Sequence, residues 1–297
     1  MKRKYIFSVG TLGIIFMLLG QLSFSINDTL VKEIVIDSKN NMSVINIIFL
    51  RGLITTSFIF LYLKFYERKN ILDIFKIKKY HQRGIYEVLT AICFFTGLIL
   101  LPIAEVYTLL MTNPFFVTIF AFLFLKEKVG IRRWTAVIFG FIGVIIVINP
   151  QNINFNFLFI FPIIAAVFLT IRDIATKGIA TKTNSFEIIF ITSVLMTLSS
   201  GIGSLFFEFT FRIEYLPNLF TSSIFLTVAY IFSVLTIFYA PLSLTASSRY
   251  SVIVFGIIFG YLILNEIPST NMIIGATIIS LSGLFVINRQ KKLGKID

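Results

Sequence analysis

The chain has 297 residues, of which 57% are hydrophobic and 13% charged, and its formal net charge is +12. A soluble protein of this length could not cover so much apolar surface, so the composition excludes a soluble globular domain and predicts a polytopic membrane protein. One cysteine and one histidine exclude a disulfide framework and a His/Cys metal cluster, and neither a metal nor a cofactor is expected.

Apolar runs of about 17 to 25 residues, the length that crosses a bilayer, predict an all-α fold of about ten membrane-spanning helices. In chain order the predicted spans are 8–31, 43–63, 84–101, 104–125, 134–148, 155–171, 185–207, 220–239, 242–264 and 272–287. The first span follows a short basic N-terminus, and we interpret it as a retained helix rather than a signal peptide.

Basic residues concentrate in alternate connections between these spans, whereas the other connections carry few charges. Lysine and arginine collect in cytoplasmic loops of membrane proteins, so both termini are predicted to be cytoplasmic. The net positive charge is thereby assigned to membrane topology, and no nucleic-acid partner is expected. The basic groups lie at residues 2–4, 64–83, 126–133, 172–182 and 289–295, whereas the opposite connections carry only Lys32, Lys39 and Arg212 among acidic residues.

The second half of the chain repeats the first. Residues 102–149 align without a gap with residues 241–288, and the pattern around Asp28 returns around Asp173. Three matches carry the alignment: Ile26-x-Asp28-x-x-x-Lys32 with Ile171-x-Asp173-x-x-x-Lys177, Ile47-Ile48-Phe49 with Ile188-Ile189-Phe190, and Leu125-x-Glu127 with Leu264-x-Glu266. Two repeats, 1–149 and 150–297, each with five spans, must cross the membrane in opposite senses, which is the inverted-repeat architecture of carriers.

Several short motifs recur in the order found in one transporter superfamily. They are Asn113-Pro114-Phe115-Phe116, Leu125-Lys126-Glu127, Arg133-Trp134, Gly140-x-x-Gly143-Val144, Arg249-Tyr250, Asn265-Glu266-x-Pro268 and Gly275, with Asn27, Lys32 and Arg51-Gly52 in the first two spans. In these residues the chain resembles the drug/metabolite transporter superfamily, in its ten-helix EamA branch. Within that branch the pattern Asn27-Asp28, Arg51, Asp173 and Arg249-Tyr250 is similar to S-adenosylmethionine uptake carriers of obligate intracellular bacteria, which implies a bacterial inner-membrane protein.

Ionisable side chains inside the hydrocarbon are costly, and they usually face a cavity or a partner. Arg51 and Arg249 fall well inside predicted spans, Asp28 is expected near the end of the first span, and Glu105 opens the fourth. We predict that these four residues contribute to a substrate site. An alternative for Arg51 is an ion pair with Asp28 that only joins the first two spans.

Hydroxyl groups follow the fourth and ninth predicted spans at matching positions of the two repeats. We predict that Thr108 and Ser247, and likewise Thr112 and Ser251, frame the same substrate site, together with Asn113 and Ser248. Tyr107 and Tyr250 offer aromatic faces to a cationic ligand. The alternative is that the hydroxyl groups bond their own backbone and serve packing only.

Three further features have mainly structural interpretations. Glu127 and Glu266 are predicted to cap or tether helix ends. The Gly256-x-x-x-Gly260 motif predicts close packing within the chain rather than a dimer, so a monomer or a weak homodimer is expected. Pro114 in the fourth span is predicted to permit bending.

The residues favour a secondary transporter that moves a small polar or zwitterionic metabolite, such as an amino acid or an S-adenosylmethionine-like solute. A drug or amino-acid efflux carrier of the same superfamily is the alternative, although no acidic residue precedes Asp28 in the first span. An intramembrane enzyme is a remote alternative, because no catalytic motif of a known class is present. A structural or signalling role lacks an accessory domain.

Overall fold

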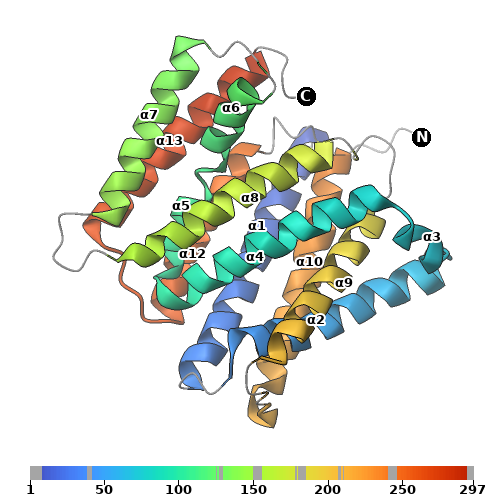
Figure 1. Cartoon of the computed structure of the whole chain (residues 1–297). Helices are drawn as coiled ribbons and strands as arrows, with labels where there is room; N and C mark the ends of the chain where they lie inside the picture. The colour runs from blue at the N-terminus through green and yellow to red at the C-terminus, as the bar shows by residue number, and fades with distance from the viewer. Residues whose placement is uncertain are drawn as a thin grey trace, which may run out of the picture. The chain divides into compact units, whose positions relative to one another are not determined.

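The computed structural model describes residues 9–38, 42–124, 126, 130–149, 156–177, 179, 185–206, 209, 211–239 and 246–292, and over these residues the regular secondary structure is entirely helical (Figure 1). The α-helices are α1 (Val9–Asp37), α2 (Val44–Leu61), α3 (Ile71–Phe75), α4 (Lys78–Leu100), α5 (Ile103–Leu110), α6 (Asn113–Leu123), α7 (Ile131–Ile148), α8 (Ile160–Lys177), α9 (Ser185–Ser204), α10 (Leu216–Tyr239), α12 (Ser251–Leu262) and α13 (Thr270–Lys292). A short π-helical segment lies at Tyr62–Tyr66, and short 3-10 segments lie at Phe157–Phe159, Ile213–Tyr215 and Ala246–Tyr250.

Among the described residues, seven helical segments are long and apolar enough to cross a membrane, and three shorter helices are also apolar. The seven are Thr11–Asp37, Val44–Tyr66, Lys78–Leu100, Ile103–Leu123, Phe157–Thr176, Phe186–Ser204 and Ile213–Ser233; the shorter three are Trp134–Ile148, Ser248–Leu262 and Thr270–Val286. The predicted class, an all-helical membrane protein, is confirmed by this pattern.

The first helix is longer than the sequence predicted. α1 continues to Asp37 instead of ending at residue 31, because Ile34 and Val35 are buried and extend its apolar face. Asp28 therefore lies inside the helix rather than at its end, and Lys32 is a buried helical residue rather than part of a connection. Both of these predicted placements are wrong.

Two other helices take up residues that were assigned to basic connections. α4 begins at Lys78 rather than at residue 84, so it includes Arg83. α8 extends to Lys177 and includes Arg172. The basic residues were misassigned because contacts between helices, those of Arg172 with Glu87 and of Arg83 with Thr192, cannot be read from local hydropathy.

The predicted span 104–125 is interrupted. Its helix stops after Leu110 and restarts as α6 at Asn113, with Pro114 in the first turn. Proline has no backbone N–H and fits the start of a helix better than its interior, so the result is a break rather than a bend in a continuous helix. The predicted bending point at Pro114 is corrected to a break at residues 111–112.

The matching span of the second repeat changes at the equivalent place. Residues 246–250 form a 3-10 turn, and α12 begins at Ser251. Under the repeat alignment Met111 corresponds to Tyr250, and Thr112 to Ser251. The α-helix predicted over 242–264 is therefore replaced by a 3-10 turn and a shorter helix, while residues 240–245 lie outside the described part of the chain.

The helices pack into two compact units, each of which is described by itself. Unit 1 comprises the described parts of residues 1–25, 103–157 and 228–297, and unit 2 those of 26–102 and 158–227. In unit 1, α7 lies along α13 and α5 packs on α12; in unit 2, α4 packs on α8 and α9, and α2 on α9 (Figure 1). Each unit takes helices from both predicted repeats.

Glycines allow close contacts between the helices of unit 1. A Cβ atom on Gly275 of α13 would lie 2.7 Å from the carbonyl oxygen of Gly143 on α7, so the two backbones touch there. Gly256 and Gly260 of α12 face α5, where a Cβ atom on Gly256 would lie 2.5 Å from the ring of Tyr107. The prediction that the Gly256–Gly260 motif packs within the chain is confirmed.

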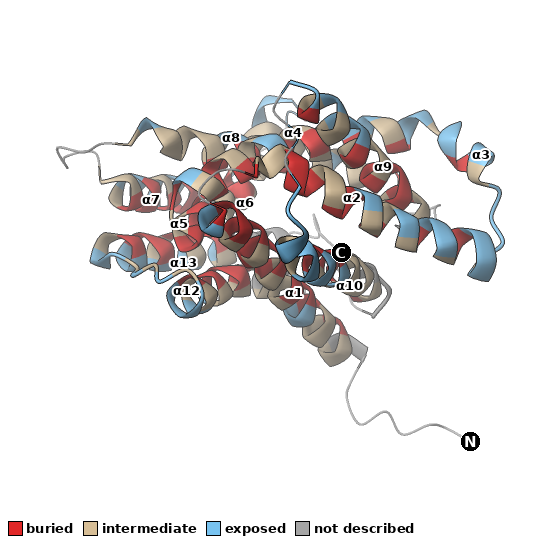
Figure 2. Cartoon of the chain, turned by 90° about the horizontal axis from the view of Figure 1, so that it is seen from below, coloured by how far each residue is buried: buried red, intermediate tan, exposed pale blue. Residues whose placement is uncertain are grey.

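Unit 2 contains an apolar cluster at one end, which includes Leu63, Tyr80 and Ile191, all fully buried. The buried faces of α2, α4 and α9 carry its core, and α3 is mostly exposed (Figure 2). The same unit also buries charged side chains in membrane-spanning helices. Those charges position the candidate site.

Candidate solute-binding site

Arg51 of α2 is held by groups from two other helices of unit 2. Its side chain is only 3% exposed. Its Nη1 donates a hydrogen bond of 2.8 Å to Oδ1 of Asn27 on α1, and the guanidinium carbon lies 5.1 Å from the ring centroid of Phe95 on α4. A cation over an aromatic face is attracted by the ring quadrupole. The guanidinium is thus fixed by an amide oxygen on one side and by a ring on another.

Asn27 connects Arg51 to a carboxylate. The Asn27 amide donates from Nδ2 to Oδ1 of Asp28 at 2.8 Å, and both residues are buried. The predicted alternative for Arg51 was an ion pair with Asp28, and the hydrogen bonds described here connect the two side chains through the Asn27 amide. Arg51, Asn27, Asp28 and Phe95 are called the arginine-51 network below.

Lys32 lies one turn beyond Asp28 on α1 and has a structural role. Its Nζ donates to the carbonyl oxygen of Leu101, the C-cap residue of α4, at 2.5 Å. Carbonyl groups at the C-terminus of a helix lack partners and carry partial negative charge, so a buried ammonium group stabilises them. Lys32 therefore anchors α1 to the end of α4.

The threonines predicted in the substrate site bond their own segment. Thr108 Oγ1 donates to the carbonyl of Ala104 at 2.7 Å, and Thr112 Oγ1 donates to that of Leu109 at 2.6 Å. Both are buried, which is the behaviour expected of packing residues. Ser251, the repeat partner of Thr112, differs, because its buried hydroxyl oxygen has no hydrogen-bond partner among the described residues.

A tyrosine joins the two interrupted spans of unit 1. Beyond the break, the N–H of Phe115 bonds to the carbonyl of Thr112 at 2.9 Å, one residue later than a regular α-helix would require. The Met111 carbonyl instead accepts a hydrogen bond of 3.3 Å from the hydroxyl of Tyr250. Since Met111 and Tyr250 are equivalent in the repeat, the contact links the same position of both halves.

The other predicted residues occupy the same unit. Glu105 lies in the first turn of α5 and is half-buried, and Asn113 is buried at the start of α6. Ser248 and Arg249 lie in the 3-10 turn and are half-buried, so Arg249 is less buried than its predicted depth implied. Ser247 belongs to the same turn. The structure therefore separates the predicted set: Asp28 and Arg51 are in unit 2, and the rest are in unit 1.

One helix-capping prediction is confirmed directly. Glu266 Oε2 accepts a hydrogen bond of 2.7 Å from the backbone N–H of Ile103, the first residue of α5. A carboxylate at a helix N-terminus satisfies an otherwise unpaired donor. Its predicted counterpart Glu127 lies outside the described residues.

A second charged network was missed by the sequence reasoning. Arg172 of α8 contacts Glu87 of α4 with N–O distances of 3.0 and 3.1 Å, and Asp173 at 2.7 Å. Arg83 contacts Glu87 at 3.0 Å and the Thr192 hydroxyl of α9 at 2.6 Å. The i,i+4 spacing of Arg83 and Glu87 was an available signal, but both basic residues had been assigned to connections. These five residues are called the arginine-172 network below.

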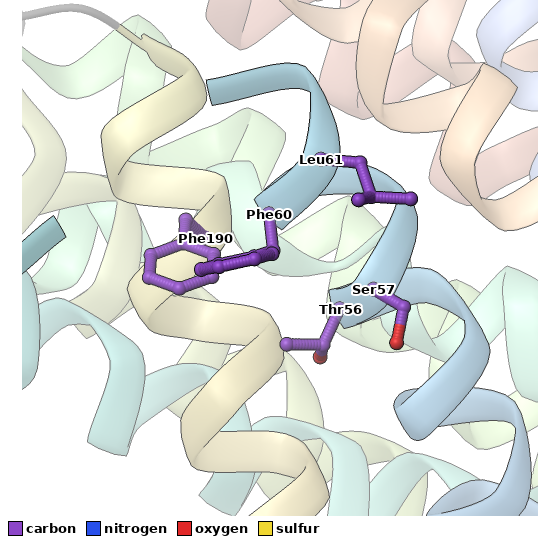
Figure 3. A pocket seen from close by; sticks show the side chains of 5 residues that line it. All are labelled: Thr56, Ser57, Phe60, Leu61 and Phe190. Atoms are coloured by element: carbon purple, nitrogen blue, oxygen red, sulfur yellow. The ribbon is translucent and has the colours of Figure 1, made fainter. Parts of the chain in front are cut away.

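A shallow pocket of about 290 Å³ lies on unit 2 between α2 and α9, lined by Thr56, Ser57, Phe60, Leu61 and Phe190 (Figure 3). Its hydroxyl groups are already bonded: Thr56 contacts Thr197 at 3.1 Å, and Ser57 donates to the Leu53 carbonyl at 2.8 Å. Phe60 and Leu61 present exposed apolar surface. The pocket therefore offers little to a polar solute.

Comparison with known proteins agrees with this architecture. The model of the EamA-like transporter family matches residues 11–149. The chain is 26% identical over 284 residues to the S-adenosylmethionine uptake transporter of Rickettsia prowazekii (strain Madrid E), covering 94% of each chain. It is 23% identical over 283 residues to the pseudopaline exporter CntI of Pseudomonas aeruginosa (strain UCBPP-PA14), covering 94% of this chain and 97% of the other.

A solved crystal structure has the same fold, with a TM-score of 0.60 and 14% identity over 92% of this chain and 98% of the other. The apolar helices and the related proteins define a membrane transporter rather than an enzyme. The same matches make the chain similar to the EamA-type transporters, and the family model covers residues 11–149.

Proposed function

We propose that this protein is a secondary active carrier that moves a small polar or zwitterionic metabolite across a bacterial inner membrane by alternating access. In this proposal ten spanning helices form two inverted repeats, 1–149 and 150–297, with both termini in the cytoplasm. Repeats of opposite sense give a carrier two related gates. The seven long and three shorter apolar helices supply segments for ten spans.

The observation that carries the proposal is the arginine-51 network. A buried arginine in a membrane span costs on the order of 3 kcal/mol, so its retention favours a functional role. The planar guanidinium of Arg51 is oriented by Asn27 and Phe95 and suits a carboxylate, which it can bind with two parallel hydrogen bonds. The nearby Asp28 carboxylate suits an ammonium or another cationic group. A solute that carries both charges fits this pair.

The interrupted spans of unit 1 supply the second set of candidate contacts. The Tyr250 hydroxyl donates a hydrogen bond to the Met111 carbonyl at the break, and the buried Ser251 hydroxyl lies at the start of α12. The remaining candidates are Arg249, Ser247, Ser248, Glu105, Tyr107, Thr108, Thr112 and Asn113.

S-Adenosylmethionine is the first solute to test, because it combines a carboxylate, an ammonium and a sulfonium group. The similarity to uptake transporters for this compound over 94% of the chain supports the choice. The purified protein should be reconstituted in liposomes loaded with unlabelled S-adenosylmethionine, and entry of the labelled compound should be measured. Accelerated counterflow is expected. Absence of counterflow with S-adenosylmethionine and with a panel of amino acids would remove the proposed substrate class.

Export is the second candidate direction, and the similarity to the pseudopaline exporter supports it. Direction depends on coupling rather than on the site alone, so the same liposomes should be given an inward or an outward proton gradient. Accumulation driven by a gradient in one sense only identifies the direction. Equal exchange without any response to a gradient identifies an exchanger.

A further inference from the structure

The two charged networks of unit 2 occupy the same positions of the two repeats. The match of Asp28 with Asp173 places Asn27 opposite Arg172 in the alignment. The match of residues 47–49 with 188–190 likewise places Arg51 opposite Thr192. Three positions of the arginine-51 network therefore have their counterparts in the arginine-172 network.

The two networks contact α4 at different levels. Phe95 belongs to the first network and Glu87 to the second, and their separation of eight positions corresponds to roughly 12 Å along the helix axis. In repeats of opposite sense, equivalent positions lie toward opposite membrane faces. The levels on α4 are consistent with that arrangement.

The partners of the two networks differ in kind. Arg51 is supported by an amide oxygen and an aromatic ring, and it reaches Asp28 through Asn27. In the second network two arginines and two carboxylates bond one another directly and join α4 to α8, and the Arg83 bond to the Thr192 hydroxyl joins α4 to α9. Nearby, Glu187 of α9 accepts from Tyr80 of α4 at 3.1 Å and contacts Lys69 at 3.1 Å. The second network is therefore an interhelical lock.

We propose that the arginine-172 network is the cytoplasmic gate of the carrier, closed by the Glu87–Arg172 ion pair between α4 and α8 and by the Arg83–Thr192 hydrogen bond between α4 and α9. Opening toward the cytoplasm then requires these pairs to separate, so that α4 can move relative to α8 and α9. The inference rests on the proposed transport function. It adds the gate and the side of the membrane on which it acts.

The test measures access to a position behind the gate. Thr90 is buried on α4, three residues after Glu87 and on the same helix face. The sole cysteine is removed by Cys93→Ser, and Thr90→Cys supplies a single thiol. Its reaction rate with a membrane-impermeant maleimide is then compared in inside-out and right-side-out membrane vesicles, with no solute present.

Glu87→Gln and Arg172→Gln should each raise the labelling rate from the cytoplasmic side by about tenfold, because either change removes the same interhelical pair. The double variant should label no faster than the faster single variant. Labelling from the other side should not change. As a matched control, Asp73→Asn removes the exposed Lys76 ion pair of 2.7 Å and should leave both rates unaltered.

Unchanged cytoplasmic labelling, an equal rise from both sides, or additive effects in the double variant would overturn the gate. If Glu87→Gln fails to accumulate as a monodisperse protein, Glu87→Asp replaces it, and a smaller one-sided rise is required. The labelling needs no solute. Failure of the wild type to transport therefore rejects the proposed function, whereas transport without one-sided labelling rejects the gate alone.

Discussion

The two compact units of this transporter are built by different interactions. Unit 1 brings backbones together at glycines, as at Gly143 and Gly275, and its spans are interrupted at matching positions of the two repeats. Unit 2 places charged side chains between helices, buried around Arg51 and half-buried around Arg172. Glycine contacts provide close packing without polar cost, whereas buried charges are retained only where they serve a purpose. In the proposals above, the arginine-51 network and the gate both lie in unit 2, whereas the closest backbone contact described in unit 1 is one of packing.

The largest effect on transport is expected when Arg51 of unit 2 is substituted. Arg51→Met removes the buried cation and should lower solute uptake at least about a hundredfold, since charge-assisted bonds to a carboxylate are strong. Arg51→Lys keeps the charge but loses the planar donor fork, and it should be intermediate. Counterflow in liposomes is the measurement. Arg212→Met, at an exposed ion pair with Glu214 of 3.2 Å, is the control and should transport normally.

A change in unit 1 should affect stability instead of affinity. In Gly275→Ala the new Cβ would lie 2.4 Å from the Val147 side chain and 2.7 Å from the Gly143 carbonyl, so α7 and α13 must separate. Overpacking of this kind costs about 1–3 kcal/mol and should lower the midpoint of thermal unfolding in detergent. Gly130→Ala, where nothing lies within 4 Å, is the control. A higher KM for the solute, with an unchanged midpoint of thermal unfolding, would contradict this difference between the units.

Substitution of the residues that orient Arg51 should change KM more than kcat. Phe95→Leu removes the ring face and Asn27→Ala the amide acceptor, and each should raise KM about fivefold, corresponding to about 1 kcal/mol. Asn27→Asp keeps an acceptor for Arg51 but loses the donor to Asp28 and places a second carboxylate beside it, so it should not recover the affinity. Phe139→Leu, at a side chain that is 59% exposed, is the control. A fall in kcat alone, with KM unchanged, would argue against a role in orienting the guanidinium.

The smallest effect is expected at the contact between the interrupted spans. Tyr250→Phe removes the hydrogen bond to the Met111 carbonyl and should cost about 0.5–1.5 kcal/mol of folding stability. Thermal unfolding of the purified protein measures this loss. Tyr261→Phe, at a residue that is 58% exposed, should show none. A large loss of uptake by Tyr250→Phe, without loss of stability, would move recognition into unit 1.

Local sequence patterns determined the apolar helices, the duplication and the family resemblance. Hydropathy and the positions of basic residues are local properties, so the approximate location of each apolar helix could be predicted without knowledge of packing. Glu266 as a cap and Gly256 as an intrachain contact were also predictable, because their residue types have few alternative uses at those positions. The EamA resemblance followed from the order of short motifs in both halves.

Tertiary structure alone decided where charge is buried and with what. α1 extends past Lys32 because its apolar face finds partners in the fold, and Asp28 becomes buried as a result. The partners of Arg51 lie on α1 and α4, and Glu87 is far in sequence from Arg172. Charges in a membrane are stabilised by contacts between helices, and such contacts leave no periodic signal in the chain. The sequence by itself therefore determined which segments are apolar and repeated, and only the packing of helices decided which polar residues act together.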